Sequence, residues 1–238
     1  MSYFRAHPLL SSLCALAILL LCLFFLKPLG LGKAPDPEDY SLALQQLQEE
    51  MYFTFQENCY LNTQGETREY FVLSGEKAAP DCHIEGRILG TEANVYLVED
   101  TLYQQLEDGT WLVNAFPDIQ HSASLFTELD PASLFLPGGT IVDEPKREGK
   151  LWYAEYVPEG TGWLGNYFTD IRYGLWLDKH GRLQKAELNA LLLEDGESVL
   201  SLELIIPEYQ ENLVLSPPSM ENTAALSPME MVLSPGEA

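Results

Sequence analysis

The sequence has few basic residues. Of its 238 residues, 13 are Lys or Arg and 36 are Asp or Glu, which gives a formal net charge of −23 at pH 7. Three of the basic residues, Arg5, Lys27 and Lys33, lie in residues 1–33, where no acidic residue occurs. The remainder is therefore strongly acidic, and an acidic surface repels the phosphates of nucleic acids. We expect no nucleic-acid partner.

Histidine is also scarce, and the familiar catalytic and metal-binding sequence patterns are absent. The four histidines are scattered without the spacing that a metal site needs. No nucleophile elbow, zinc-protease motif or phosphate-binding loop is present. The abundant carboxylates make chance pairs unavoidable, so none indicates acid–base catalysis. We expect a protein that is not an enzyme and that uses no metal or other cofactor.

Cysteine is limited to four residues. Cys14 and Cys22 fall within a long apolar run, where a thiol behaves as a small hydrophobic group. Cys59 and Cys82 remain for the rest of the chain. In an oxidising compartment they can form one disulfide, which the chain-entropy model values at about 3 kcal/mol, and otherwise they are two free thiols.

One uncharged apolar run stands near the N-terminus. Residues 9–26 read LLSSLCALAILLLCLFFL, and as a helix they span roughly 27 Å, enough to cross the hydrocarbon core of a bilayer. A cleaved signal peptide usually has a shorter apolar region, although Gly30-Leu31-Gly32 is a possible cleavage site. Neither Cys in the run follows a small residue as lipidation requires. We expect a retained membrane anchor over residues 1–27.

The positive charges on the two flanks of the apolar run are nearly balanced, so they set no orientation. A short N-terminal head followed by a single apolar run behaves as an uncleaved signal sequence. The prediction is a single-pass protein of the cell membrane whose C-terminal body is extracytoplasmic.

A tether and a helix follow the predicted anchor. Residues 28–39 are rich in proline and acidic residues and have little capacity to fold alone. Apolar residues then recur at helical spacing, which predicts an amphipathic helix capped by Asp39 or Ser41. Its apolar face would contain Tyr40, Leu44, Leu47, Met51 and Phe55.

Short strands joined by turns dominate from residue 68 to residue 206. Strands are predicted over residues 70–73, 83–88, 94–98, 101–107, 110–113, 150–157, 167–177, 182–193 and 198–206, and Asp108-Gly109 is a strong hairpin signal. Alternation places one apolar face on the last two strands, typical of an antiparallel sheet. That face would contain Ala186, Leu188, Ala190, Leu192, Leu200, Leu202, Leu204 and Ile206.

Two segments interrupt the strand pattern. Residues 122–129 and 131–136 predict short helices that must bury their apolar side chains, and the concave side of the sheet is the natural place. Residues 207–238 hold five prolines, no Lys or Arg and three copies of Leu-Ser-Pro, which predicts a disordered acidic tail.

Residues 86–111 (GRILGTEANVYLVEDTLYQQLEDGTW) and Trp176-Leu177-Asp178, which stands before the turn at Gly181, carry a distinctive pattern of strands and turns. With the order of the predicted elements, this pattern resembles the bacterial lipoprotein-carrier superfamily of the LolA/LolB and LppX/LprG type. The resemblance covers residues 40–206. It implies an α+β fold in which a curved antiparallel sheet, an incomplete β-barrel, wraps around an N-terminal helix and short helices on its concave face and encloses a lipid-sized cavity.

The resemblance implies a binding module of the cell envelope that holds a lipid or lipoprotein acyl chain without catalysis, and the apolar run of residues 9–26 adds the expected membrane anchor. The expected cavity residues are Leu125, Phe126, Leu129, Leu134, Phe135, Leu188, Leu192, Leu200 and Leu202. Trp163 and Leu164 form the tip of a glycine-rich loop, and an exposed tip would touch a membrane or the cavity mouth. The alternative is a ligand-free envelope scaffold or sensor domain that docks a protein partner.

Overall fold

The computed structural model describes residues 33–50, 52–99, 101–115, 131–219 and 223–225. Its described elements lie within one compact unit, Pro35–Ala238. The helices are α3 (Pro37–Glu49) and the short 3-10 helices η1 (Pro131–Leu134) and η2 (Gly162–Asn166). The strands are β1 (Tyr52–Thr63), β2 (Glu66–Ala78), β3 (Asp81–Ile88), β4 (Thr91–Val98), β5 (Thr101–Gln105), β6 (Trp111–Ala115), β7 (Gly139–Ile141), β8 (Lys146–Glu148), β9 (Leu151–Pro158), β10 (Phe168–Leu177), β11 (Leu183–Leu192), β12 (Val199–Tyr209) and β13 (Thr223–Ala225).

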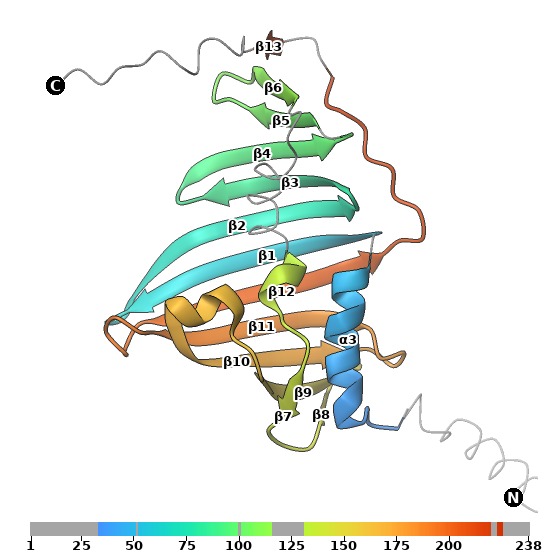
Figure 1. The fold of residues 1–238 in the computed structure, drawn as a ribbon, viewed down its shortest axis with the longest axis vertical. Helices are drawn as coiled ribbons and strands as arrows, with labels where there is room; N and C mark the ends of the chain where they lie inside the picture. Colours follow the sequence, from blue (N-terminus) through green and yellow to red (C-terminus); the bar gives the residue numbers. More distant parts are fainter. Residues whose placement is uncertain (1–32, 51, 100, 116–130, 220–222, 226–238) are drawn as a thin grey trace, which may run out of the picture. The chain divides into compact units, whose positions relative to one another are not determined.

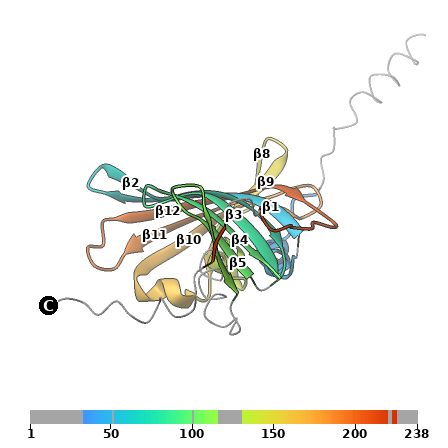
Figure 2. The same cartoon turned by 90° about the horizontal axis from the view of Figure 1, so that it is seen from above.

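All these strands join one sheet. Its order is β13-β6-β5-β4-β3-β2-β1-β12-β11-β10-β9-β7, with β8 paired to β9 (Figure 1). Every pairing is antiparallel except that of β13 with β6. The sheet twists along its length (Figure 2). Within the described residues its two end strands, β13 and β7, do not pair with each other, so the sheet stays open. The predicted α+β class with a curved, mostly antiparallel open sheet is confirmed.

The helix α3 begins earlier and ends earlier than the apolar spacing predicts. Asp36 is its N-cap, rather than Asp39 or Ser41, because Pro37 suits the first helical position and the Asp39 carboxylate accepts a hydrogen bond from the Asp36 backbone N–H at 2.7 Å. The predicted tether therefore overlaps the helix start. Tyr40, Ala43, Leu44 and Leu47 are its buried residues.

The predicted continuation of this helix to Phe55 is wrong. Glu50 is already extended, and Phe55 belongs to strand β1, where it is buried on the same face as Phe53. The segment from Tyr52 to Phe55 is aromatic and β-prone, and its two-residue alternation suits a sheet with one buried face. A spacing of four residues fits the helical period of about 3.6 and also the strand period of two. Spacing alone therefore placed Phe55 in the helix.

Strand β2 runs through Gly75, beyond the end of the strand predicted over residues 70–73. A Cβ at this position would clash with the carbonyl oxygen of His83 and with the ring of Phe55. Glycine is required here because a neighbouring strand and an aromatic ring approach the backbone closely. The Asp108-Gly109 turn, by contrast, joins β5 and β6 as predicted.

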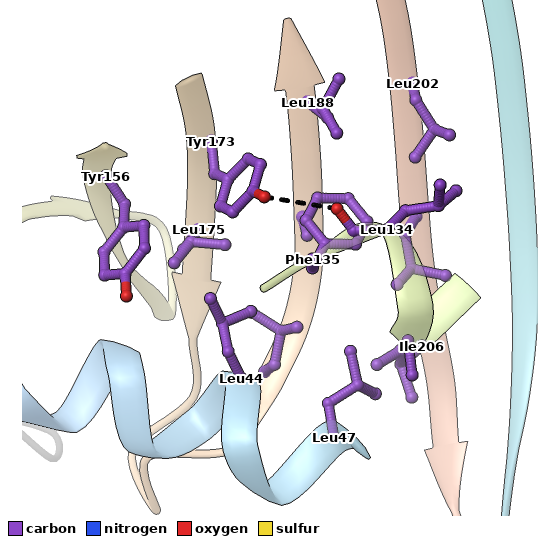
Figure 3. Packing of buried hydrophobic residues seen from close by; sticks show 14 of the residues in the cluster. Leu44, Leu47, Leu134, Phe135, Tyr156, Tyr173, Leu175, Leu188, Leu202 and Ile206 are labelled. Carbon is purple, nitrogen blue, oxygen red and sulfur yellow. Dashed lines mark hydrogen bonds between the residues drawn. The ribbon is translucent and has the colours of Figure 1, made fainter. Parts of the chain in front are cut away.

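The strands β11 and β12 carry the apolar face that the alternation predicted. Their register pairs Ala186 with Leu204, Leu188 with Leu202, and Ala190 with Leu200. The small alanine side chains leave room on this face, and α3 contacts both β10 and β11 there. The main hydrophobic core therefore lies between the concave side of the sheet and α3 with η1 (Figure 3).

The segment after β12 departs from the predicted disordered tail. Strand β12 extends to Tyr209, and the next backbone N–H, from Gln210, bonds to the carbonyl oxygen of Tyr52 at 3.1 Å. Leu215 is then buried in a second apolar cluster, and β13 pairs with the edge strand β6. Residues 207–219 thus lie against the sheet because their leucines cover apolar side chains on its outer face. That cluster contains Ala78, Val98, Tyr103 and Trp111.

The predicted membrane anchor, residues 9–26, lies outside the described residues and stays a prediction. Within the part of the chain that the structure describes, no helix has the length and apolar character needed to span a bilayer. The predicted helical segment 122–129 is also outside the described residues. The segment predicted over 131–136 is present as η1.

Candidate functional site

An apolar cavity of about 370 Å³ opens on the concave side of the sheet. This volume is at the lower end of the range for small-molecule pockets, about 300–1,000 Å³. Strands β1, β2, β10, β11 and β12 form its wall, and η1 and η2 cover it. The lining residues are Cys59, Tyr70, Phe71, Leu134, Trp163, Leu164, Tyr167, Phe168, Leu188, Leu192, Leu200 and Leu202.

One row of paired residues crosses the cavity wall. Leu188 on β11 faces Leu202 on β12, Leu202 faces Cys59 on β1, and Cys59 faces Phe71 on β2. Directly opposed residues in a sheet point to the same face. Four strands therefore contribute one apolar side chain each at the same level of the wall.

The cover is tied to the wall by Tyr173, a buried residue of β10. Its hydroxyl donates a hydrogen bond to the carbonyl oxygen of Leu134 in η1 at 3.3 Å (Figure 3). The same hydroxyl accepts a hydrogen bond from the Leu136 backbone N–H at 3.3 Å. The ring of Phe135 packs edge-on against Tyr173, with ring centroids 5.2 Å apart. Burial is the main cause that raises the pKa of Tyr173, so it keeps its proton at neutral pH.

Exposed aromatic side chains surround the opening. Trp163 is 47% exposed, Tyr167 59% and Tyr70 41%, and all three line the cavity. The prediction of an exposed loop tip at Trp163 and Leu164 is therefore correct for Trp163 only. Trp163 is exposed, but Leu164 is buried, because successive residues of the short helix η2 point in different directions. Aromatic side chains at such a rim combine an apolar body with a polar group that tolerates water.

The structure brings most of the predicted cavity residues together. Phe135 differs, because its ring is wholly buried among core side chains and does not line the cavity. Residues 125, 126 and 129 (Leu125, Phe126 and Leu129) lie outside the described residues. The predicted residues that line the cavity are Leu134, Leu188, Leu192, Leu200, Leu202, Trp163 and Leu164.

Sequence analysis missed other lining residues. Phe71 and Phe168 stood in or at the ends of predicted strands, so alternation could have placed them on the inner face. Which inner-face residues reach the cavity depends on strand register, which the sequence did not supply. The missed lining residues are Cys59, Tyr70, Phe71, Tyr167 and Phe168.

The disulfide left open by the sequence does not form. Neither Cys59 nor Cys82 takes part in a disulfide. Cys82 of β3 pairs with Lys77 of β2, and Lys77 pairs with Phe53 of β1. Cys82 is therefore level with Phe53, which is six positions from Cys59 along β1. At about 3.3 Å per residue the offset along the strands is roughly 20 Å, far beyond disulfide reach. Burial, followed by the charge of Glu57, raises the pKa of Cys59 to about 12, so its thiol is unreactive at neutral pH.

A larger, polar hollow of about 770 Å³ lies elsewhere on the sheet, near the β3–β4 and β5–β6 turns. Its lining includes Glu85, Glu92, Glu107, Asn94 and Gln105. Such a lining suits water better than an apolar ligand. The described residues include no group of three or more His, Cys, Asp or Glu placed to hold a metal ion. The apolar cavity is therefore the candidate site.

Comparisons with known proteins give structural similarity only. No protein-family model matches the sequence, and no curated protein matches it. A LolA superfamily protein from Nitrosomonas europaea is similar in structure, with 7% identity and a TM-score of 0.31, over 71% of this chain and 92% of that one. A DUF1329 family protein from Desulfovibrio piger is similar at 16% identity and a TM-score of 0.25, over the same shares. The predicted resemblance to lipoprotein carriers thus has a counterpart among solved structures, but at these scores it does not bear on the ligand.

Proposed function

We propose that this protein is a membrane-anchored, extracytoplasmic binding module that holds a lipid or lipoprotein acyl chain in the cell envelope without catalysis. The observation that supports the proposal is the apolar cavity on the concave face, with leucines on its wall and aromatic residues around its opening. Membrane anchoring rests on the apolar run at residues 9–26.

The binding energy would come from burial of apolar surface. Shielding about 400 Å² of acyl surface from water is worth roughly 10 kcal/mol at about 25 cal/mol per Å², before ordering costs are subtracted. The walls are already assembled by the sheet, so few protein side chains have to be ordered on binding. No covalent step is involved.

The direct test is native mass spectrometry of residues 35–238, which contain every described element and both apolar clusters. The protein is purified from an envelope-exported form, and bound molecules are extracted with organic solvent. A co-purifying mass of lipid size supports the proposal. A clean ligand-free mass, together with no binding of the neutral apolar dye N-phenylnaphthylamine, overturns it and favours the protein-docking scaffold.

A matched pair of variants assigns the binding to the cavity. Leu200→Trp places a large side chain at a lining position, whereas Leu89→Trp places the same side chain at a position that is 70% exposed and outside the cavity. The first variant should lose dye binding, and the second should keep it. If a folded Leu200→Trp protein, checked by circular dichroism, binds dye normally, the ligand is held elsewhere.

Topology needs its own experiment. Protease added to intact cells should digest the body of the protein if residues 34–238 are extracytoplasmic. Protection in intact cells followed by digestion after lysis would reverse the proposed orientation.

A further inference from the structure

The second apolar cluster, here called the outer-face cluster, lies on the opposite face of the sheet from the cavity. Tyr103 of β5 pairs with Tyr96 of β4 and with Val113 of β6, so three strands present apolar or aromatic side chains at one level. The ring of Trp111 packs edge-on against Tyr96, with ring centroids 5.7 Å apart. The outer-face cluster consists of Ala78, Val98, Tyr103 and Trp111, with Tyr52, Tyr96 and Val113 partly buried beside them.

The segment after β12 covers this cluster and is held there by two leucine side chains. Leu213 and Leu215 pack against the cluster, whereas Val214 between them is 86% exposed, as in an extended peptide that lies with one side on a surface. Figure 1 shows the segment passing beside β1 to β4 on its way from β12 toward β6. Among the described residues, no backbone hydrogen bond joins residues 211–219 to the sheet. The contact therefore selects side chains at alternate positions, and another peptide with the same two anchors would fit it.

The pattern of the docked segment recurs near the C-terminus. Residues 213–217 read LVLSP, and residues 231–235 read MVLSP. Met231 takes the place of Leu213, and these two residue types replace each other in apolar sites at small cost because their volumes are close. The remaining Leu-Ser-Pro, residues 226–228, follows two alanines and so lacks the first anchor. Residues 231–235 are thus the second copy that keeps both anchors.

The second copy can reach the outer-face cluster of its own molecule. Strand β13 pairs with β6, with Thr223 opposite Trp111, so the chain returns to the cluster before the second copy begins. Docking of the second copy leaves residues 211–230 as a loop after Gln210, whose backbone N–H bonds to Tyr52. Closing this loop costs free energy, so the first copy is the preferred occupant, as observed.

Charge also favours an occupant from the same molecule over one from a second molecule. Each chain has a formal net charge of −23, so two copies repel each other. A flexible link within one chain, by contrast, gives an effective concentration in the millimolar range. A weakly binding second copy therefore competes for the cluster of its own molecule far better than for that of a neighbour.

We propose that the outer-face cluster is a peptide-binding site with two occupants in the same chain, residues 213–217 and residues 231–235. With the first copy docked, residues 218–238 follow it. With the second copy docked, only residues 236–238 follow it, so exchange draws the C-terminal end of the chain against the sheet. The lining of the cavity shares no residue with the cluster, and the inference does not rest on the proposed function.

Three ten-residue peptides taken from the sequence test the site. Residues 229–238 contain the second copy, residues 211–220 the first, and residues 221–230 the Leu-Ser-Pro that lacks the first anchor. Fluorescence anisotropy measures the binding of each labelled peptide to an opened variant of residues 35–238, in which both internal copies are weakened. The first two peptides should bind at least about tenfold more tightly than the third. The opened variant carries Leu213→Ala, Leu215→Ala and Leu233→Ala.

The parent protein is the control for the opened variant, and circular dichroism checks that the variant is folded. The parent's own copies compete for the cluster, so it should bind the peptide of residues 229–238 at least about tenfold more weakly. Equal binding to both proteins would place the peptide elsewhere and overturn the proposal. The proposal also fails if this peptide binds no better than that of residues 221–230, or if none of the three peptides binds.

A cross-linking experiment reports which copy is docked, and it keeps the proposal testable if the opened variant does not fold. Met231 is replaced by the photoreactive residue p-benzoylphenylalanine in residues 35–238, and mass spectrometry identifies the cross-linked peptides. Cross-links to β4, β5 and β6 should increase several-fold when Leu215→Ala weakens the first copy. The matched control is Val214→Ala, at the exposed neighbouring position, and it should cause no increase.

Two results of the cross-linking would contradict exchange within one chain. The first is an unchanged yield of cross-links to β4, β5 and β6 in the Leu215→Ala protein. The second is a cross-linked dimer on a denaturing gel, which would assign the second copy to the cluster of a neighbouring molecule.

Discussion

The hydroxyl of Tyr173 bonds to the carbonyl oxygen of Leu134 across 3.3 Å, and this contact joins strand β10 to the helix η1 that covers the cavity. The two residues are 39 positions apart in the sequence. The hydroxyl also accepts the Leu136 backbone N–H, so one buried side chain satisfies two backbone groups of the covering segment. This side chain therefore helps to fix the position of the covering segment, which also accepts a hydrogen bond from the Gln48 side chain at the Phe135 carbonyl oxygen, at 3.4 Å.

Removal of this hydroxyl should therefore weaken the fold. Tyr173→Phe leaves a buried carbonyl and a partly buried N–H without their partner, and we expect the free energy of unfolding to fall by about 2 kcal/mol. Urea denaturation measures the change. The control Tyr167→Phe, at an exposed position, should stay within about 0.5 kcal/mol of the parent protein. Equal stability of the two variants would contradict the anchoring role.

The segment after β12 should contribute to stability. Leu215→Ala removes a side chain buried against Trp111 and Tyr103, and we expect a loss of roughly 2–3 kcal/mol in unfolding free energy. The adjacent Val214 is 86% exposed, so Val214→Ala should change stability little. Urea unfolding of both variants separates the outcomes. If Leu215→Ala leaves the unfolding free energy unchanged, this segment does not pack on the sheet in solution.

The thiols of Cys59 and Cys82 should not form a disulfide. Mass spectrometry of peptides from residues 35–238, digested without reduction, should find Cys59 and Cys82 unlinked even after purification in air. Cys82 should react with iodoacetamide first, because it is more exposed and because the pKa of Cys59 is raised to about 12 by burial and the charge of Glu57. A peptide pair joined through these two residues would refute the observed strand register.

Alkaline pH should destabilise the protein through its buried tyrosines. Burial, followed by the charge of Asp39, raises the pKa of Tyr40 to about 12, and burial also raises the pKa of Tyr156 and of Tyr173. In the unfolded chain the tyrosine pKa is about 10. The stabilisation is thus complete below about pH 10 and is lost as the pH rises toward 12.

Urea unfolding at about pH 8 and about pH 11 measures this loss, and tyrosinate absorbance reports the ionisation. Tyr40→Phe should flatten the dependence, because it removes one of the groups that must ionise on unfolding. Unchanged stability of the parent protein between the two pH values would contradict the burial of these hydroxyl groups.

Local sequence patterns predicted much of the sheet. The two-residue alternation in β11 and β12 marked their buried face, and Asp108-Gly109 marked a hairpin, because both signals depend on neighbours within one strand or one turn. The same kind of signal failed for Phe55, whose spacing from Met51 fits a helix and whose spacing from Phe53 fits a strand. Only pairing with β2, where Phe55 faces Gly75, decided between them.

Composition and alternation establish the acidic character of the chain, its strand-rich class and the apolar face that includes Leu188, Leu192, Leu200 and Leu202. Strand pairing brings Cys59 and Phe71 level with Leu188 and Leu202 on the wall and places Cys82 far from Cys59. The fold also turns Leu164 inward while Trp163 stays exposed. The physical reason is register. Alternation selects the face of a strand on which a side chain lies, but pairing between distant strands sets its position along that face.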